Sequence, residues 1–338
     1  MDFLIDIFLL LTGLLVILGG CELFTNGIEW MGKRFNVAEG AVGSILAAVG
    51  TALPETMVPL VAIIGSFFTK STAANNIAVG AILGAPFMLG TLAFFVTGLA
   101  ILIFTKQGKR TKDICVDSRY IIRDMSYFLI VFFVVVLSGL FRLPFAGKVI
   151  LAVLLLGFYG YYIFITITQE GKVGEDLKAL HFARNSEIPK RRWIFVQLFV
   201  SLALIIGGAH IFVVYLEKFA SLIHAPPLIL SLLLTPVATE LPEKMSSVIW
   251  VSQKKDTLAL GNITGAMVFQ TCIPVSVGLI GTTWVFDGYC IASTLITLAS
   301  GLTIYLLTSR KKCFSPSILM MGGIFYLIFI LYILFSQK

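Results

Sequence analysis

The sequence predicts an all-α integral membrane protein with about ten transmembrane helices, arranged as two inverted-topology repeats of five helices each. Three observations predict this fold class: long uninterrupted apolar stretches, a similarity between the two halves of the chain, and an uneven distribution of Lys and Arg between alternate loops. Of the 338 residues, 58% are apolar and 13% are charged, whereas an average soluble domain carries about 25% charged residues. The lipid bilayer is therefore the expected solvent of most of the surface.

Apolar segments long enough to cross a bilayer recur along the whole chain. A hydrocarbon core about 30 Å thick requires about 20 consecutive apolar residues in a helix. The first segment carries Asp2 and Asp6 where a secretory signal would carry positive charge, and no small-residue cleavage site follows it, so we expect it to be retained. The predicted spans are 3–28, 39–66, 73–103, 121–140, 146–168, 193–217, 227–251, 257–282, 289–308 and 315–335.

The loops between these spans differ in positive charge. The odd-numbered loops carry 19 Lys and Arg residues, and the remaining loops and ends carry 5. Cytoplasmic loops are the ones enriched in Lys and Arg, so we expect a multi-pass protein of the cell membrane with both termini outside the cytoplasm. The net charge of +7 is explained by this topology, and no nucleic-acid partner is expected.

The two halves of the chain align with each other at a shift of 188 residues. Thr51-Ala52-Leu53-Pro54-Glu55 then lies over Thr239-Glu240-Leu241-Pro242-Glu243. With the shift reduced to 181, the segment 80–85 lies over 261–266, and Gly80, Gly84, Gly261 and Gly265 are spaced for close helix packing. Five spans per half invert the second half relative to the first. We therefore expect a first repeat at 1–168, a cytoplasmic linker at 169–192 and a second repeat at 193–338.

Cysteine and histidine give no metal or redox motif. The five cysteines are scattered without such spacing, and none of the three histidines has a second one within helical reach. We expect the cysteines, Cys21, Cys115, Cys272, Cys290 and Cys313, to be structural fillers, and we expect no cofactor.

The two Leu-Pro-Glu motifs provide the candidate site. Proline in a helix leaves the carbonyl four residues earlier without its bond, here at Gly50 and Ala238. Within a membrane such a group is tolerated where protein, water or an ion satisfies it. A glutamate follows each proline, and a threonine lies one turn back on the same face. Carboxylate, hydroxyl and carbonyl oxygens are hard ligands suited to Ca²⁺ or Na⁺; the ligands expected from the two motifs are Gly50, Thr51, Glu55, Ala238, Thr239 and Glu243.

The motifs resemble the α-repeats of the calcium/cation antiporter superfamily, which includes sodium/calcium exchangers. In that family each repeat contains Gly-Thr-Ser-Leu-Pro-Glu, and a helix with Gly-Ser-Asn follows. The segments 50–55 and 238–243 are similar to the first signature. The resemblance implies ten spans, a cytoplasmic central loop and outside termini. It also implies that Glu55 and Glu243 bind Ca²⁺, with Na⁺ sites completed by neighbouring hydroxyls and by the Gly-Ser-Asn helices.

This chain departs from the pattern at the positions that the resemblance assigns to Na⁺. Gly84-Ala85-Pro86 and Gly265-Ala266-Met267 stand where the family has Gly-Ser-Asn. Leu89 and Gln270 occupy the positions where Asn or Asp is usual, and Ala52 and Glu240 replace the two serines of the Leu-Pro-Glu signatures. Several oxygens that would hold Na⁺ are missing, so the match does not imply coupling to three Na⁺.

Four further polar residues allow two interpretations each. Glu240 and Lys244 stand four residues apart, which favours a helical ion pair; alternatively, Glu240 is a third cation ligand, or Lys244 is an internal cation that replaces a lost Na⁺. Glu22 and His210, equivalent across the repeat, are either a proton relay or residues with local structural roles.

The sequence thus predicts a secondary-active antiporter that exchanges Ca²⁺ or another divalent cation for Na⁺ or H⁺ by alternating access. Its metal-site candidates are Glu55, Glu243, Thr51, Thr239, Gly50, Ala238, Glu240 and Gln270. The alternative is a divergent relative that transports another solute or uses H⁺ alone, with its Na⁺ sites lost. An intramembrane enzyme would require a nucleophile–base pair or a metal motif, and the sequence contains neither.

Overall fold

The computed structural model describes residues 2–34, 53–116, 118–169, 179–184, 189–309 and 313–336. Eight helices in these ranges are long and apolar enough to cross a membrane, and two further apolar segments, Glu55–Thr69 and Pro227–Glu240, are shorter. Together they correspond to the ten predicted spans, and the all-α membrane fold class is confirmed. The predicted second span, 39–66, is described only from Leu53 onward.

The helices of the described ranges divide between the two halves of the chain. The first half contains α1 (Asp2–Arg34), α4 (Leu53–Thr69), α5 (Thr72–Met88), α6 (Phe94–Lys106), α7 (Ser118–Leu140) and α8 (Phe145–Gln169). The second half contains α9 (Arg191–Leu222), α10 (Pro227–Ser252), α11 (Asp256–Gly281), α12 (Gly288–Thr308) and α13 (Ser317–Ser336). Short elements complete the set: the π-helix η2 (Leu89–Ala93), the 3-10 helix η3 (His181–Ala183), and the strands β1 (Ile114–Cys115) and β2 (Cys313–Phe314).

Helices α5 and α6 form one span that is interrupted by η2. The span Thr72–Lys106 has Pro86 in its first helix, and η2 follows three residues later. Proline cannot donate the helical hydrogen bond, and a π-turn is one way a helix accommodates such a defect; π-turns often occur at functional sites. Leu89 begins this π-turn and is fully buried. It occupies a position where Asn or Asp is usual in the family that the sequence resembles.

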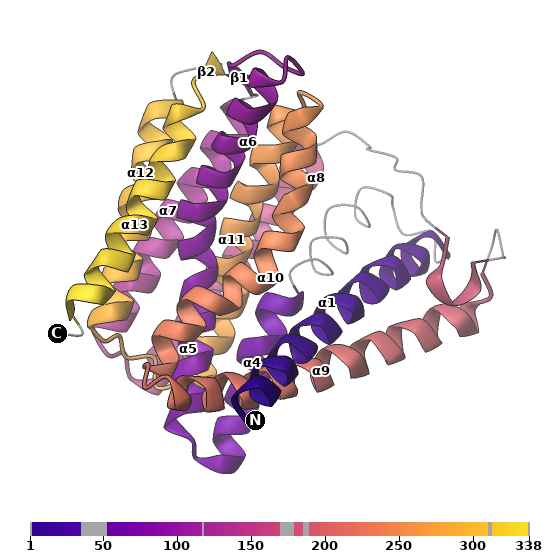
Figure 1. Ribbon diagram of the computed structural model, residues 1–338, viewed down its shortest axis with the longest axis vertical. Helices are drawn as coiled ribbons and strands as arrows, with labels where there is room; N and C mark the ends of the chain where they lie inside the picture. The colour runs from indigo at the N-terminus through magenta and orange to yellow at the C-terminus, as the bar shows by residue number, and fades with distance from the viewer. Residues whose placement is uncertain are drawn as a thin grey trace.

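Helices α1 and α9 form an arm set obliquely to the rest of the molecule (Figure 1). At 1.5 Å per residue the 33 residues of α1 extend over about 50 Å, so the helix fits a bilayer only when strongly tilted. Contacts of Gly13 with Phe212 and Gly208, and of Gly20 with Ser201, show that the two helices run antiparallel. They are the first helices of the two repeats, so this pairing agrees with inverted topology.

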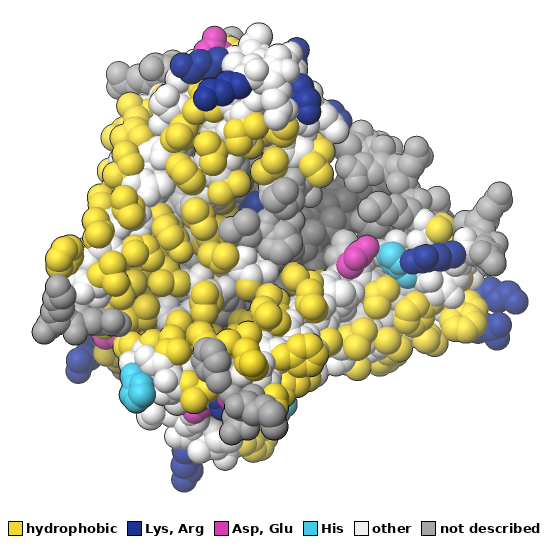
Figure 2. Space-filling view, viewed as in Figure 1, with side chains coloured by type: hydrophobic (Ala, Val, Ile, Leu, Met, Phe, Trp, Pro, Cys, Tyr) yellow, Lys and Arg dark blue, Asp and Glu magenta, His cyan; other side chains and the backbone are white. Residues whose placement is uncertain are grey.

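The remaining helices form a bundle with a continuous apolar core. Buried residues of α5, α6, α7, α8, α10, α11, α12 and α13 make up most of the main core, whereas a smaller cluster joins α1, α4, α9 and the start of α5. Figure 2 shows hydrophobic side chains over much of the visible outer face, and Lys and Arg at the end of the bundle where β1 and β2 lie. A surface of this kind is expected where lipid surrounds the helices and one membrane face carries the positive charge.

Small residues allow α5 and α10 to lie in backbone contact. A side chain at Gly84 would meet the carbonyl oxygen of Leu232 and would lie 2.7 Å from Pro236 Cγ, and Gly80 approaches Leu228 and Ser231 in the same way. The predicted close packing is thus confirmed for these two glycines. For Gly261 and Gly265 it stays a prediction, because positions 40, 44 and 48, which the shift of 188 residues places over Leu228, Leu232 and Pro236, lie outside the described residues.

Candidate cation site

The first Leu-Pro-Glu motif lies at the start of α4. The helix begins at Leu53, so Glu55 stands in its first turn, where the positive end of the helix dipole favours a carboxylate. The Glu55 side chain is only 3% exposed. Helix α4 contacts both α10 and α11, which carry the second motif and Gln270 respectively. A buried carboxylate inside a membrane protein is costly, and such residues usually mark a substrate or ion pathway.

The second motif lies in the middle of α10. This helix is continuous from Pro227 to Ser252, so Pro242 does not divide it into two helices. Glu240 and Lys244 lie one turn apart on this helix, with Lys244 Nζ 3.5 Å from Glu240 Oε2. Both side chains are almost fully buried. The geometry therefore supports mutual pairing of these two residues.

Gln270 of α11 completes a polar cluster with this pair. Its Nε2 donates to Glu240 Oε1 at 2.8 Å. Since an ionised carboxylate only accepts hydrogen bonds, the amide nitrogen must face Glu240. The amide oxygen Oε1 is buried and has no hydrogen-bond partner within the described part of the chain. An acceptor without a donor in a dry site is unfavourable, and a cation would satisfy it.

Polar groups continue from Lys244 along the interface of α10 and α11. Lys244 Nζ lies 3.5 Å from the carbonyl oxygen of Asn262, and Asn262 Nδ2 donates to Ser247 Oγ at 3.1 Å. Ser247 Oγ in turn donates to the carbonyl oxygen of Ala259 at 3.0 Å. The polar contacts thus extend from Glu240 toward the end of α10 that adjoins the start of α11.

The structure places the predicted site residues unequally. Glu55, Glu240 and Gln270 are buried on three helices that contact one another. The Thr239 hydroxyl is buried and donates to the carbonyl of Thr235, in its own helix. The remaining candidates lie in or beside the same motifs: Ala238 is in α10, the side chain of Glu243 is not among those described, and Gly50 and Thr51 lie outside the described residues. Among the described side chains no group of three Asp, Glu, His or Cys comes together.

The proton-relay interpretation of Glu22 and His210 depended on burial, and the structure does not support it. Both residues are exposed. The Glu22 side chain is 72% exposed, and its Oε1 lies 3.7 Å from Nε2 of His181 in η3. Glu22 therefore makes a local contact with His181 at the surface of the arm.

Sequence reasoning missed a buried carboxylate in the bundle. Asp124 of α7 accepts from Tyr162 Oη of α8 at 3.0 Å and from Thr264 Oγ1 of α11 at 2.9 Å, and Arg123 donates to it at 3.0 Å. The cluster joins three helices, one of which carries Gln270. The position of Asp124 inside the predicted apolar span 121–140 is a signal that could have identified it as a buried carboxylate. Its partners could not be identified in this way, because two of them lie on helices distant in sequence.

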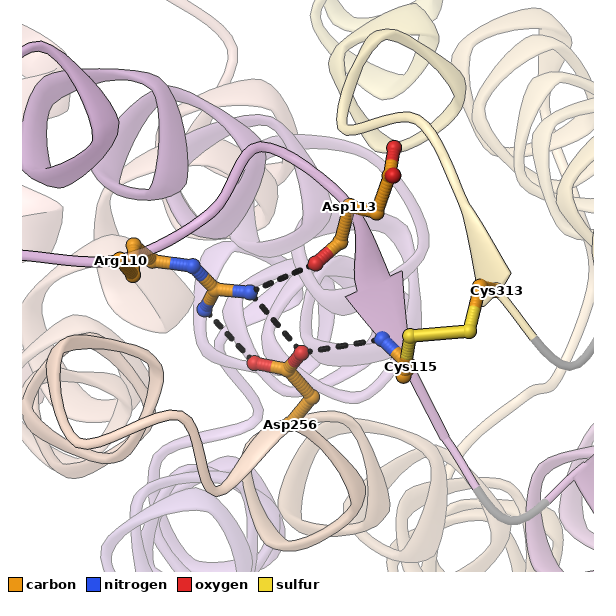
Figure 3. Close-up of a disulfide and its surroundings, with 5 residues drawn as sticks. All are labelled: Arg110, Asp113, Cys115, Asp256 and Cys313. Atoms are coloured by element: carbon orange, nitrogen blue, oxygen red, sulfur yellow. Dashed lines mark hydrogen bonds and ion pairs between the residues drawn. A yellow bond between two sulfur atoms is a disulfide. The ribbon is translucent and has the colours of Figure 1, made fainter.

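A second buried ion pair braces the start of α11 (Figure 3). Arg110 Nη1 and Nη2 contact Asp256 Oδ1 and Oδ2 at 2.7 and 2.9 Å. The other donors of the guanidinium group bind the carbonyl oxygens of Thr111, Val251 and Asp113. A single side chain therefore ties the segment after α6 to the end of α10 and the start of α11. From the sequence, Arg110 is counted only as one of the positively charged residues of the odd-numbered loops.

Beside this ion pair, β1 and β2 are joined by a disulfide between Cys115 and Cys313 (Figure 3). The two residues are directly opposite each other in the antiparallel pair, and the Cys115 amide donates to Asp256 Oδ2 at 3.1 Å. The prediction of structural fillers is wrong for these two cysteines. Cys21, Cys272 and Cys290 are buried and are not part of this disulfide.

The fold and the buried carboxylates define a class of membrane transporter built from inverted repeats. The profile of the sodium/calcium exchanger protein family matches residues 5–168 and 193–338, and the chain belongs to this family. The family comprises cation exchangers and not enzymes.

Individual relatives agree with this assignment. The chain is 26% identical over 309 residues to the putative antiporter CaxA of Alkalimonas amylolytica, covering 89% of this chain and 88% of CaxA. It is 25% identical over 268 residues to the uncharacterized membrane protein MJ0091 of Methanocaldococcus jannaschii, covering 79% of each chain.

Solved structures share the fold. The crystal structure of the H⁺/Ca²⁺ exchanger CAX superposes with a TM-score of 0.74 at 15% identity, covering 97% of this chain and 82% of that chain. The sodium-calcium exchanger NCX_Mj superposes with a TM-score of 0.59 at 19% identity, covering 97% of this chain and 98% of that chain.

Proposed function

We propose that this protein is a secondary-active antiporter that exchanges Ca²⁺, or another divalent cation, for H⁺ or Na⁺ by alternating access. The observation that carries the proposal is the burial of Glu55 at the start of α4, against the helices that hold Glu240 and Gln270. Carboxylate and amide oxygens are the ligands that Ca²⁺ prefers. Glu55 and Glu243 are the proposed charged ligands, and Gln270 Oε1, the Thr51 and Thr239 hydroxyls and the carbonyls of Gly50 and Ala238 are the proposed neutral ones.

Alternating access would use the two repeats, 1–168 and 193–338, connected by the cytoplasmic linker 169–192. In the proposed orientation both termini lie outside the cytoplasm of a plasma-membrane protein, and β1 and β2 lie on the cytoplasmic side with the positively charged loops. The interface between α4–α5 and α10–α11 would contain the transported ion, as in other inverted-repeat transporters.

H⁺ is favoured over Na⁺ as the counter-ion by the side chains near the site. At the positions that would complete Na⁺ coordination, this chain carries Ala85, Leu89 and Met267, all of which are buried and apolar. Na⁺ binding requires several hard oxygen ligands. A proton requires one carboxylate oxygen, which Glu55 and Glu243 provide.

Flux measurements in proteoliposomes test this function. Vesicles that contain the purified protein and a fluorescent Ca²⁺ indicator are given external Ca²⁺ with an outward gradient of either H⁺ or Na⁺. We expect Ca²⁺ uptake well above that of protein-free vesicles, and more with the H⁺ gradient than with the Na⁺ gradient. Uptake at the protein-free level with both gradients, for Ca²⁺ and for Mn²⁺ or Sr²⁺, would contradict the proposal.

A further inference from the structure

Lys244 and Glu240 form a charged pair that occurs in only one of the two repeats. At the shift of 188 residues that aligns the Leu-Pro-Glu motifs, Glu240 and Lys244 lie over Ala52 and Thr56, which are neutral. The two motif glutamates contribute two negative charges in symmetric positions. The additional pair contributes one charge of each sign, so the site as a whole keeps two negative charges.

Both oxygens of the Glu240 carboxylate already have donors. Gln270 Nε2 lies 2.8 Å from Oε1, and Lys244 Nζ lies 3.5 Å from Oε2. The positive charge beside Glu240 is thus already supplied from within the protein. The Lys244 side chain is 5% exposed and that of Glu240 1% exposed, so water does not screen the pair.

The Lys244 ammonium group places a positive charge beside a carboxylate and a backbone carbonyl. It contacts the Glu240 carboxylate and lies 3.5 Å from the carbonyl oxygen of Asn262. A carboxylate together with a backbone carbonyl is the kind of oxygen set that would coordinate Na⁺. The lysine is covalently attached, so this positive charge cannot be transported.

The same pair also orients Gln270. Because Glu240 accepts from the amide nitrogen, Gln270 Oε1 is left without a partner within the described part of the chain. The amide oxygen is thereby available as a neutral ligand for the transported ion. Glu240 is thus a positioning residue for Gln270.

From these contacts we infer that Lys244 is a tethered cation that replaces a bound Na⁺ and sets the site charge at minus two. This inference rests on the proposed cation exchange at the same site, and it determines the class of counter-ion. A site of charge minus two is balanced by one divalent cation or by two monovalent charges. Exchange of one divalent cation for two monovalent ones at such a site is electroneutral, and because Lys244 occupies the place beside Glu240, no additional Na⁺ is bound there.

Na⁺ binding by the purified protein tests the inference without requiring transport. Thermal unfolding in detergent, at mildly alkaline pH, is compared in NaCl and in choline chloride, since a ligand that binds only the folded state raises the Tm. The wild type is expected to show no Na⁺-specific shift. Lys244→Met leaves Glu240 without its cation and should gain an upward shift of a few degrees in Na⁺.

Two further variants serve as controls. The double variant Glu240→Gln/Lys244→Met restores a site charge of minus two and should show no Na⁺ shift, like the wild type. Lys218→Met removes an exposed lysine of α9 that lies over the Tyr215 ring, and it should also resemble the wild type. A Na⁺ shift of equal size in the wild type and in Lys244→Met would overturn the inference, as would a folded Lys244→Met that gains none.

A transport measurement separates this inference from the proposed function. In proteoliposomes clamped with K⁺ and valinomycin, Ca²⁺ uptake by the wild type should not change with membrane potential. Uptake that rises with potential would overturn the inference while leaving the exchange function in place. Absence of all Ca²⁺ uptake would overturn the proposed function, whereas the Na⁺-binding comparison would still decide the role of Lys244. If Lys244→Met does not fold, a Na⁺ shift in the wild type alone still contradicts the inference.

Discussion

Glu55→Gln is expected to lower the rate of Ca²⁺ transport by at least about 100-fold while leaving the protein folded. The substitution keeps the size of the side chain and removes its charge. At an effective dielectric constant of about 20, a unit charge pair separated by about 4 Å interacts by about 4 kcal/mol. Since about 1.4 kcal/mol corresponds to a tenfold change in affinity, the loss of one anionic ligand is sufficient for this effect.

The thermal stability of Glu55→Gln should be equal to or higher than that of the wild type. Burying a carboxylate is unfavourable, so the neutral amide is not expected to lower the Tm. Glu217→Gln is the matched control: Glu217 Oε1 accepts a hydrogen bond from Ser71 Oγ at 2.9 Å, and an amide oxygen accepts the same bond. Both variants are measured by Ca²⁺ uptake and by thermal unfolding. A Glu55→Gln protein that transports within twofold of the wild type would contradict the assignment of Glu55.

Asp256→Ala is expected to destabilise the protein by about 3–5 kcal/mol, because it leaves a buried guanidinium group without its counter-charge. The Arg110 and Asp256 side chains are 1% and 5% exposed, and the contact is bidentate. Removal of the Asp256 carboxylate also leaves the Cys115 amide without its hydrogen-bond acceptor. The Tm in detergent should fall by at least about 5 °C.

The double variant Arg110→Met/Asp256→Leu separates the charge effect from the loss of packing. Replacing both members of a buried pair by apolar side chains is often close to neutral, whereas removing one is not. We therefore expect the double variant to be more stable than Asp256→Ala. Equal losses in the two proteins, or a change below about 1 kcal/mol in Asp256→Ala, would show that the pair does not brace the start of α11.

Much of the fold could be predicted from sequence because its signals are local. Each span is visible as an apolar run, and the inverted repeat is visible because the Leu-Pro-Glu motifs recur at one shift. The candidate site could be predicted for the same reason, since Glu55 and Glu243 each follow a proline within an apolar segment. The Glu240–Lys244 pair was also predictable, because residues four apart share a helix face.

The interactions that were missed depend on which helices become neighbours. Cys115 and Cys313 are separated by 198 residues, and no spacing rule connects them. Asp124 obtains its donors from α8 and α11, and Arg110 lies in a charged segment where its pairing with Asp256 has no local signal.

The most direct test of the central claim is trans-stimulation of Ca²⁺ transport. Proteoliposomes are loaded with Ca²⁺ or left free of it, and the initial uptake of radioactive Ca²⁺ is measured without any H⁺ or Na⁺ gradient. An alternating-access antiporter with its ion site at Glu55 predicts faster uptake into the loaded vesicles, with no such acceleration in Glu55→Gln. Uptake by the wild type that is unchanged or slowed by internal Ca²⁺ would contradict exchange.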